Sequence, residues 1–292
     1  MEATPVVQLP SYLGEGPVWH SIQQLLYWVD IENGEVHALE PHTNRHRVWH
    51  VRKRVGAVVP AANGSLILAL QGEISRMDPD TGAVKKILSL EADIPDNRCN
   101  DGKTDPAGRF WIGTMERKCQ PGRGSLYCID HDFQVTRVLT GLTISNGMGW
   151  SLEESYMYFI DSADHNVRRF KFDKNHPSLT EEKVILSFAD EKESPDGMCV
   201  DREGMLWIAF WGGYRVGRYD PHSGKHLGDV RVPVPLASSC CFGGKDLKTL
   251  YITTAREGLS REQLEQYPLS GSLFSCRTGV SGSDSYLFGR KG

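Results

Sequence analysis

A short turn–strand motif recurs six times along the 292 residues and constrains the fold more than any other feature. Two copies, Asp105–Gly113 and Asp201–Ala209, share the pattern Asp, two residues, Gly, two residues, Trp-Ile. A shorter copy is Ala62–Ala69, and three further copies keep the strand with a different turn: Ser21–Asp30, Ser151–Asp161 and Lys245–Thr254. The equivalent apolar anchors, spaced 39, 44, 48, 48 and 44 residues apart, are Trp28, Ile67, Trp111, Phe159, Trp207 and Tyr251. Such near-constant spacing indicates a repeat architecture.

Each repeat contains enough short apolar runs for four β-strands. One apolar stretch precedes the anchor strand, as Asn146–Trp150 precedes Phe159, and one or two more strands follow it. Four strands per unit, repeated six times, are typical of a β-propeller. A large β-sandwich, the alternative all-β fold, would not repeat one turn–strand motif at near-constant spacing. We therefore predict an all-β, six-bladed propeller with four-stranded antiparallel blades, which takes up residues 1–292 as a single domain.

Two terminal segments complete this prediction. We expect the ring to close by pairing Val6–Leu9 into the last blade beside Ser285–Gly289. We expect only one helix, Ser260–Tyr267, because Ser260 is a good N-cap residue and an acidic residue follows in the first turn.

The charge and hydropathy patterns exclude several classes of partner. Lys and Arg number 33 and Asp and Glu 37, for a net charge of −4, and no segment concentrates basic residues. Nucleic acid is therefore not an expected partner. The apolar runs, such as Leu66–Leu70, are far shorter than the roughly 20 residues that cross a bilayer, so no membrane association is expected. The N-terminus lacks the pattern of a secretion signal, which favours a cytoplasmic location.

The cysteines do not indicate a disulfide framework or a zinc–thiolate site. There are seven, an odd number, and none forms a Cys-x-x-Cys pair. Buried free thiols in a reducing compartment explain this pattern best. The neighbouring Cys240 and Cys241 allow a redox device as an alternative, although such a pair more often packs within a strand.

Four polar residues share one position relative to the anchors. Glu15 and Asn146 each precede an anchor by 13 residues, Asn100 and Asp196 each precede one by 11, and a glycine follows each closely. The first strand of a propeller blade lines the central channel, so these side chains are expected to meet at one end of it. Carboxylate and amide oxygens with two negative charges suit one divalent cation. Any one of the four could instead be a turn residue at a blade rim, but four in one register favour a shared site.

Other residues near this register are possible walls of the same pocket. Arg98 lies two residues before Asn100, and Glu116 follows the strand that carries the third anchor, where a surface charge is the alternative. At the equivalent place, the second blade supplies Arg54 or Gly56. The sequence contains no Gly-x-Ser-x-Gly, His-Glu-x-x-His or phosphate-binding Gly-x-x-x-x-Gly-Lys motif. A metal-centred hydrolase or a metal-binding module is therefore favoured.

Several motifs resemble the family that contains senescence marker protein (regucalcin), gluconolactonase and luciferin-regenerating enzyme. They recur in order over the whole chain and are Leu13–Trp19, Arg98–Lys103, Phe110–Met115, Ile144–Gly147, Pro195–Gly197 and Cys241–Gly244. This resemblance implies a six-bladed propeller with one axial divalent cation, of which Ca, Zn, Mn, Mg and Fe are the candidates. It places the metal ligands on Glu15, Asn146 and Asp196. It places the substrate-contacting residues on Arg98, Asn100 and Glu116.

The resemblance also implies an activity, the metal-dependent hydrolysis of a sugar lactone to its aldonic acid. The cation would polarise the lactone carbonyl and activate a water, and Asp196 would act as the general base if one of its oxygens is free of the metal. A non-enzymatic calcium-binding regulator of the regucalcin type is the main alternative, and a propeller with a vestigial channel is another. Gly149 stands where the family often has an acidic residue, which affects the expected shape of the pocket. The expected partner is a small sugar lactone, and the expected state is a monomer or a weak homo-oligomer.

Overall fold

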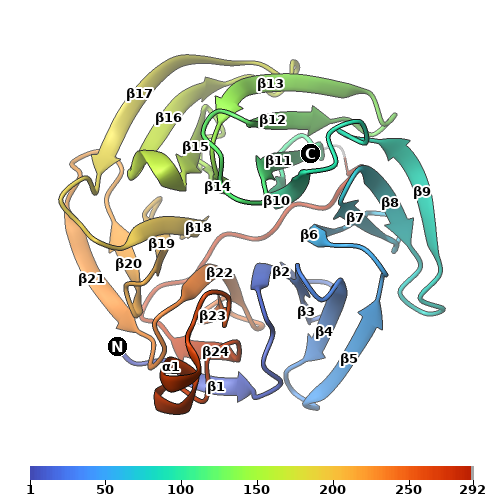
Figure 1. The fold of residues 1–292 in the computed structure, drawn as a ribbon. Coiled ribbons are helices and arrows are strands. Elements are labelled where there is room, and N and C mark those ends of the chain that lie inside the picture. Colours follow the sequence, from blue (N-terminus) through green and yellow to red (C-terminus); the bar gives the residue numbers. More distant parts are fainter. Residues whose placement is uncertain (291–292) are drawn as a thin grey trace.

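A computed structural model describes residues 1–290 of the chain. Its strands form six four-stranded antiparallel sheets, which are arranged as blades around a central axis (Figure 1). This arrangement confirms the predicted all-β, six-bladed propeller. No helix among the described residues is long and apolar enough to cross a bilayer.

The strands fall into four concentric positions. The innermost strands are β2 (Gly14–His20), β6 (Val55–Pro60), β10 (Asn97–Thr104), β14 (Ser145–Trp150), β18 (Ser194–Val200) and β22 (Ala237–Gly243). The second strands are β3 (Leu25–Asp30), β7 (Leu66–Leu70), β11 (Phe110–Glu116), β15 (Tyr156–Asp161), β19 (Leu206–Trp211) and β23 (Thr249–Thr254). The third strands are β4 (Glu35–Glu40), β8 (Glu73–Met77), β12 (Gly124–Ile129), β16 (Asn166–Phe172), β20 (Arg215–Tyr219) and β24 (Leu273–Arg277). The outermost strands are β5 (Arg45–His50), β9 (Val84–Ser89), β13 (Val135–Leu142), β17 (Leu179–Ser187), β21 (His226–Arg231) and β1 (Thr4–Val7).

Burial explains why the inner strands read as continuous apolar runs. Strands such as β3 and β7 are almost fully buried, because neighbouring blades cover both faces. Outermost strands such as β9 are largely exposed. All six anchor residues predicted from the repeat are buried in the resulting core.

The two most similar copies of the repeat share an aspartate that holds the turn to the strand. Asp105 accepts hydrogen bonds from two backbone N–H groups of its own turn and, at 2.8 Å, from Nε1 of Trp111. Asp201 does the same in its blade, and accepts from Nε1 of Trp207 at 2.9 Å. The recurring Asp and Trp are therefore one structural unit that repeats with the blades.

The ring closes in a different way from the one predicted. The N-terminal strand β1 does pair into the last blade, but over Thr4–Val7, and its partner is β24. The predicted partner, Ser285–Gly289, forms no strand. The predicted helix is confirmed as α1 (Arg261–Gln266), which Ser260 caps together with Gln263. A single 3₁₀ turn, η1 (Ser162–Asp164), follows β15.

The segment after β24 crosses one end of the central channel instead. Its backbone N–H groups donate to carbonyl oxygens near the last residues of the innermost strands: Ser283 to Val200 at 3.2 Å and Phe288 to Pro60 at 2.9 Å. Figure 1 shows this faint red segment running behind the innermost strands. Because these contacts are at the carboxyl ends of the strands, the opposite end of the channel stays clear of the tail.

Candidate functional site

A break in strand pairing directs the four polar residues of the shared register toward the axis. The register between the innermost and second strands shifts at Glu15/Val18, Cys99/Gly102, Ser145/Met148 and Pro195/Met198. Such a bulge changes the direction of a side chain within a strand. In these four blades it lies at or next to Glu15, Asn100, Asn146 and Asp196, all of which are buried.

Glycine allows this geometry at two of the positions. Gly16, which follows Glu15, has a φ of +54°, a left-handed conformation that other residues rarely adopt. Gly147, which follows Asn146, lies so close to the next blade that a Cβ atom would be 2.5 Å from the carbonyl oxygen of Asp196. The glycines noted in the sequence thus bring adjacent innermost strands together where the polar side chains converge.

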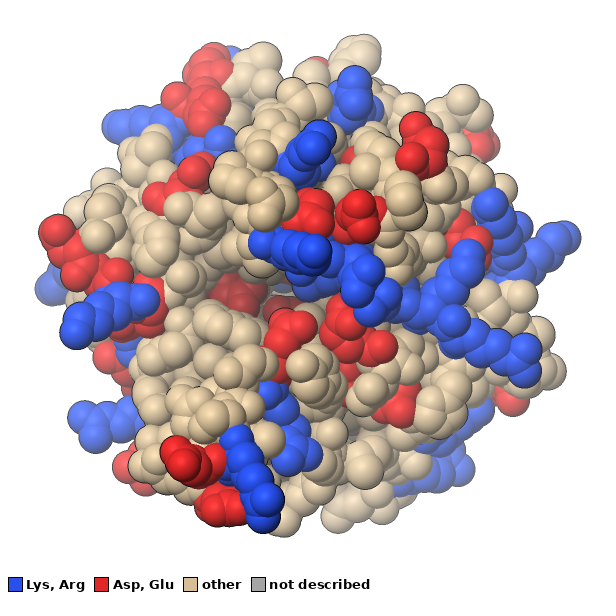
Figure 2. All heavy atoms as spheres, in the orientation of Figure 1, with Lys and Arg blue, Asp and Glu red and all other residues tan. Residues whose placement is uncertain are grey.

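The polar residues line one cavity of about 220 Å³ at the amino ends of the innermost strands. The charged and amide side chains of its wall are Glu15, Arg98, Asn100, Asn146, Asp196 and Glu257, and Ser162, Ser194 and Cys119 also line it. Met115 and Trp211 contribute apolar surface. Figure 2 shows this face of the molecule hollowed at its centre, with acidic side chains in the hollow.

Direct hydrogen bonds join three of these residues across blades. Asn100 Nδ2 donates to Asn146 Oδ1 at 3.1 Å and to the carbonyl oxygen of Ser145 at 2.8 Å. Arg98 Nη1 donates to Asn100 Oδ1 at 2.5 Å. Asn146 Nδ2 donates to Ser162 Oγ at 2.9 Å, which leaves its carbonyl oxygen directed toward Asn100. These bonds fix the orientation of both amides.

Glu15 and Asp196 form no ion pair with the described residues, although Arg98 lines the same cavity. Burial, together with the nearby carboxylate of Asp101, raises the pKa of Glu15 to about 8. Burial and the charge of Glu15 raise the pKa of Asp196 well above its ordinary value. Asp196 Oδ1 and Asp101 Oδ2 are buried and accept no hydrogen bond from the described residues. Carboxylates left in this state are what a bound cation would stabilise.

The donor atoms fit a divalent cation that prefers oxygen. Glu15 and Asp196 supply carboxylates and Asn146 supplies an amide oxygen, and the thiol of Cys119, which also lines the cavity, is outside this proposed ligand set. Within residues 1–290, no three His, Cys, Asp or Glu side chains converge as a metal site. A cation here would therefore need the amide as a ligand in addition to the two carboxylates.

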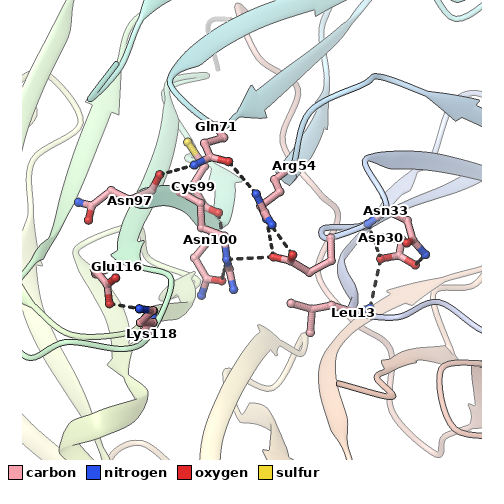
Figure 3. A network of polar contacts seen from close by, with 12 residues as sticks. Leu13, Asp30, Asn33, Arg54, Gln71, Asn97, Cys99, Asn100, Glu116 and Lys118 are labelled. Atoms are coloured by element: carbon pink, nitrogen blue, oxygen red, sulfur yellow. Dashed lines mark hydrogen bonds and ion pairs between the residues drawn. The ribbon is translucent and has the colours of Figure 1, made fainter. Parts of the chain in front are cut away.

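Glu116, expected from the sequence to contact substrate, and Cys99, the neighbour of Arg98 and Asn100, both lie outside the wall of the cavity. Glu116, at the end of β11, is buried, but it does not line the cavity, and its Oε2 accepts from the backbone N–H of Lys118 at 2.8 Å (Figure 3). Cys99 is buried and faces away from its neighbours Arg98 and Asn100, with its thiol donating to the carbonyl oxygen of Leu70. The cavity thus receives Arg98 and Asn100 directly, whereas Glu116 shapes the loop that follows β11.

Two aspartates that position the site were not assigned a role from the sequence. Asp30 accepts hydrogen bonds from the backbone N–H of Leu13, just before β2 begins. Asp161 accepts from the backbone N–H of Ile144, just before β14. Each thereby fixes the chain two residues ahead of Glu15 or Asn146. The signal was present, because both aspartates end an anchor strand in the same register, as Val-Asp and Ile-Asp.

A polar network behind Arg98 was also not apparent from the sequence. Glu32 accepts from Arg54 Nε with both carboxylate oxygens at 2.8 Å, and its Oε1 lies 3.9 Å from Arg98 Nε. Arg54 in turn donates to Gln71 at 3.2 Å, and Gln71 donates to the carbonyl oxygen of Asn97 (Figure 3). Arg54 is therefore part of the support of the wall rather than of its surface.

Known proteins resemble this chain over nearly its whole length. Residues 13–256 match the SMP-30/Gluconolactonase/LRE-like region. Regucalcin from Oryctolagus cuniculus is 35% identical over 283 residues, 95% of each chain. YvrE of Bacillus subtilis, named provisionally as a sugar lactone lactonase, is 32% identical over 282 residues, 97% of each chain. The crystal structure of a calcium-binding regucalcin from Agrobacterium tumefaciens matches with a TM-score of 0.94 at 29% identity, covering 99% of this chain and 97% of that one. The chain therefore belongs to the SMP-30/gluconolactonase/LRE-like family, as its sequence motifs indicated.

Proposed function

We propose that this protein is a divalent-metal-dependent hydrolase that opens a sugar lactone to its aldonic acid. The observation that carries the proposal is a single cavity that holds two buried carboxylates, neither of them in an ion pair, together with Arg98, whose guanidinium keeps hydrogen-bond donors for a polyhydroxylated ligand. The likeness to the Bacillus subtilis protein supports the same activity. Because every blade contributes to the ring around this cavity, we propose that the whole chain acts as one domain.

In this proposal Glu15, Asn146 and Asp196 hold the cation. When bound, such a cation supplies Lewis-acid polarisation of the carbonyl and a lower pKa for water. Asp196, whose Oδ1 is unpartnered among residues 1–290, accepts the proton of the attacking water. The carbon–oxygen bond of the ring then breaks, and the released ring oxygen takes up a proton to complete the hydroxy acid.

Arg98 and Asn100 orient the substrate. The guanidinium is 8% exposed, and its position is fixed by Asn100 and by the network around Glu32, so little freedom is lost when it binds a ligand. Glu116 remains a proposed substrate contact. Its Oε2 accepts hydrogen bonds from the backbone N–H groups of Lys118 and Gln120, so Oε1 is the oxygen that remains for that contact.

A second candidate function is calcium binding without turnover. It is favoured by one observation, the likeness to the Agrobacterium tumefaciens regucalcin, which is described as a calcium-binding protein. The same oxygen ligands would serve both functions, so turnover has to decide between them.

A lactone screen distinguishes the two. The protein is incubated with five- and six-carbon aldonolactones, with and without a chelator. A pH indicator reports the acid released, and the rate of spontaneous hydrolysis is subtracted. We expect turnover of at least one lactone, loss of that turnover on chelation, and recovery when a single cation is restored. Stoichiometric cation binding with no lactone hydrolysed above the buffer rate would establish the binding protein instead.

A further inference from the structure

Glu257 occupies a fixed place in the cavity wall, outside both the proposed cation ligands and the proposed substrate contacts. It lies after β23, in the loop that leads to α1, and lines the cavity on the side of the last blade. The backbone N–H groups of Arg256 and Glu257 both donate to the carbonyl oxygen of Tyr12, at 2.9 and 3.1 Å. These two bonds tie the loop to the segment that enters β2, which holds Glu257 beside the cavity.

The carboxylate of Glu257 is half-buried and has no partner. It forms no hydrogen bond or ion pair with any other residue in the described range 1–290. Burial raises the pKa of Glu257 and the negative charge of Glu32 adds to this rise, whereas the positive charges of Arg98 and, to a smaller extent, Arg54 oppose it. An unpartnered acid in a partly buried wall is unlike an ordinary surface glutamate, which solvent surrounds.

Arg98 has spare donors toward the same space. Its Nη1 is used by Asn100 and by the carbonyl oxygen of Cys99, whereas its Nη2 donates to no residue among those described. Its Nε lies 3.9 Å from Glu32, too far for a hydrogen bond. Arg98 and Glu257 therefore line one cavity with opposite charges and do not pair with each other.

A hydroxyl group is the ligand that matches this arrangement. A guanidinium can only donate hydrogen bonds and a carboxylate can only accept them, whereas a hydroxyl does both. We propose that a substrate hydroxyl bridges the two, accepting from Arg98 and donating to Glu257, so that this pair selects neutral polyhydroxylated lactones over lactones without hydroxyl groups. A lactone that carries a carboxylate at this place would be repelled by Glu257. This assignment rests on the proposed lactonase function and identifies a hydroxyl group as the substrate feature that the site recognises.

The test compares two six-membered lactones, D-glucono-1,5-lactone and δ-valerolactone, which has no hydroxyl groups. In Glu257→Ala, we expect kcat/KM for gluconolactone to fall at least about tenfold, because a hydroxyl and a charged partner lose their hydrogen bond. The value for δ-valerolactone should change by less than about twofold, since that substrate never made the bond. In Glu257→Gln, which keeps a hydrogen-bonding oxygen, kcat/KM for gluconolactone should be intermediate between those of wild type and Glu257→Ala. An equal loss on both lactones, or no loss on either, overturns the assignment.

Glu32→Gln is the matched control. It also removes a carboxylate next to Arg98, but Glu32 does not line the cavity, so kcat/KM for gluconolactone should fall much less than in Glu257→Ala. A loss in Glu32→Gln as large as that in Glu257→Ala would show that the charge around Arg98, rather than contact with Glu257, selects the hydroxyl.

Binding of 1,5-anhydroglucitol, the cyclic polyol that lacks the carbonyl, separates this inference from the proposed activity. Calorimetry with cation-loaded protein should show binding to wild type that is at least about tenfold weaker in Glu257→Ala. If wild type hydrolyses no lactone but this difference persists, the proposed function is wrong and the hydroxyl site stands. If wild type binds the polyol no better than the variant does, the hydroxyl site is wrong whatever the activity.

Discussion

The two ends of the central channel are built from the same innermost strands, but they differ in whether their polar groups have partners within the chain. At the amino ends, Glu15 and Asp196 are buried and form no ion pair with the described residues, and Asp196 Oδ1 accepts no hydrogen bond from them. At the carboxyl ends, the C-terminal segment donates backbone hydrogen bonds to Pro60 and Val200, and Phe288 packs into the core. A propeller therefore satisfies one end of its channel with its own backbone and leaves the other end for a ligand. Substitutions at the two ends should accordingly have different consequences.

We call the end of the channel at the amino ends of the innermost strands the open end, and the end covered by the C-terminal segment the closed end. The largest effect is expected at the open end. Asp196→Ala should abolish lactone turnover and tight binding of a divalent cation, because it removes both a proposed ligand and the proposed base. The propeller should still fold, since Asp196 accepts few bonds from the rest of the chain. Circular dichroism, metal analysis and the indicator assay together check this. A variant that keeps full metal stoichiometry and lactonase activity would remove Asp196 from the site.

The second effect is a pH-dependent stability that arises from Glu15 at the open end. Without a cation, the pKa of Glu15 is about 8 in the folded protein, compared with 4.5 for an unperturbed glutamate. A pKa raised by folding stabilises the protein below pH 4.5, and this stability is lost as the pH rises toward 8. At about 1.4 kcal/mol per unit, the metal-free protein should lose up to about 5 kcal/mol of unfolding free energy across this range.

Chemical denaturation of the chelated protein at a series of pH values measures this loss. Saturation with cation should flatten the profile, because the bound cation favours the ionised carboxylates. Glu15→Gln should make the profile shallower without any cation, and Asp196, whose pKa burial also raises, should account for part of the slope that remains. A metal-free wild type whose stability rises from pH 5 to pH 8 would contradict the raised pKa of Glu15.

The closed end should respond to substitution in stability alone. Phe288 is 5% exposed and packs against Phe133, with ring centroids 5.3 Å apart. Phe288→Ala should lower the unfolding free energy by about 3–5 kcal/mol, because it leaves a cavity in the core. The folded fraction should keep its kcat/KM and its metal stoichiometry. A fall in kcat/KM measured well below the melting temperature would show that the two ends are coupled.

A smaller effect separates substrate contacts from metal ligands at the open end. Arg98→Ala and Asn100→Ala should each retain the cation, because neither is a proposed ligand. Loss of a hydrogen bond that involves a charged group costs about 1.5–3 kcal/mol, so kcat/KM should fall at least about tenfold. Metal analysis of each purified variant is the control. If either loses its cation, that residue contacts the metal.

The sequence predicted the open end better than the closed end, for a physical reason. Glu15, Asn146 and Asp196 repeat with the blades, so their convergence follows from the anchor spacing alone. Glu257 lies in a loop that reaches the cavity only after the ring has closed, and no periodicity marks it. Ser285–Gly289 was wrongly expected to pair in a blade. It follows the glycines at 279 and 282 and instead bonds to carbonyl groups that the innermost strands leave free.

The smallest effect is expected from the cysteines. All seven are free in the structure, and burial raises the pKa of Cys99 to about 12, which leaves almost no reactive thiolate at neutral pH. We therefore expect full activity in strong reductant and seven free thiols in the mass spectrum of unreduced protein. A disulfide between Cys199 and Cys240, whose sulfur atoms lie 3.6 Å apart, is the exception that this spectrum would reveal.

Alkylation of the folded protein tests the same prediction residue by residue. Cys119 is exposed and lines the cavity, so it should react first, whereas Cys99 should stay unmodified until the protein unfolds. The thiol of Cys99 donates to the carbonyl oxygen of Leu70, on the face of β10 opposite to Arg98 and Asn100. Peptide mapping after a short exposure to iodoacetamide assigns the label. Rapid labelling of Cys99 that abolishes activity, with protection by a lactone, would mean that this thiol points into the open end after all.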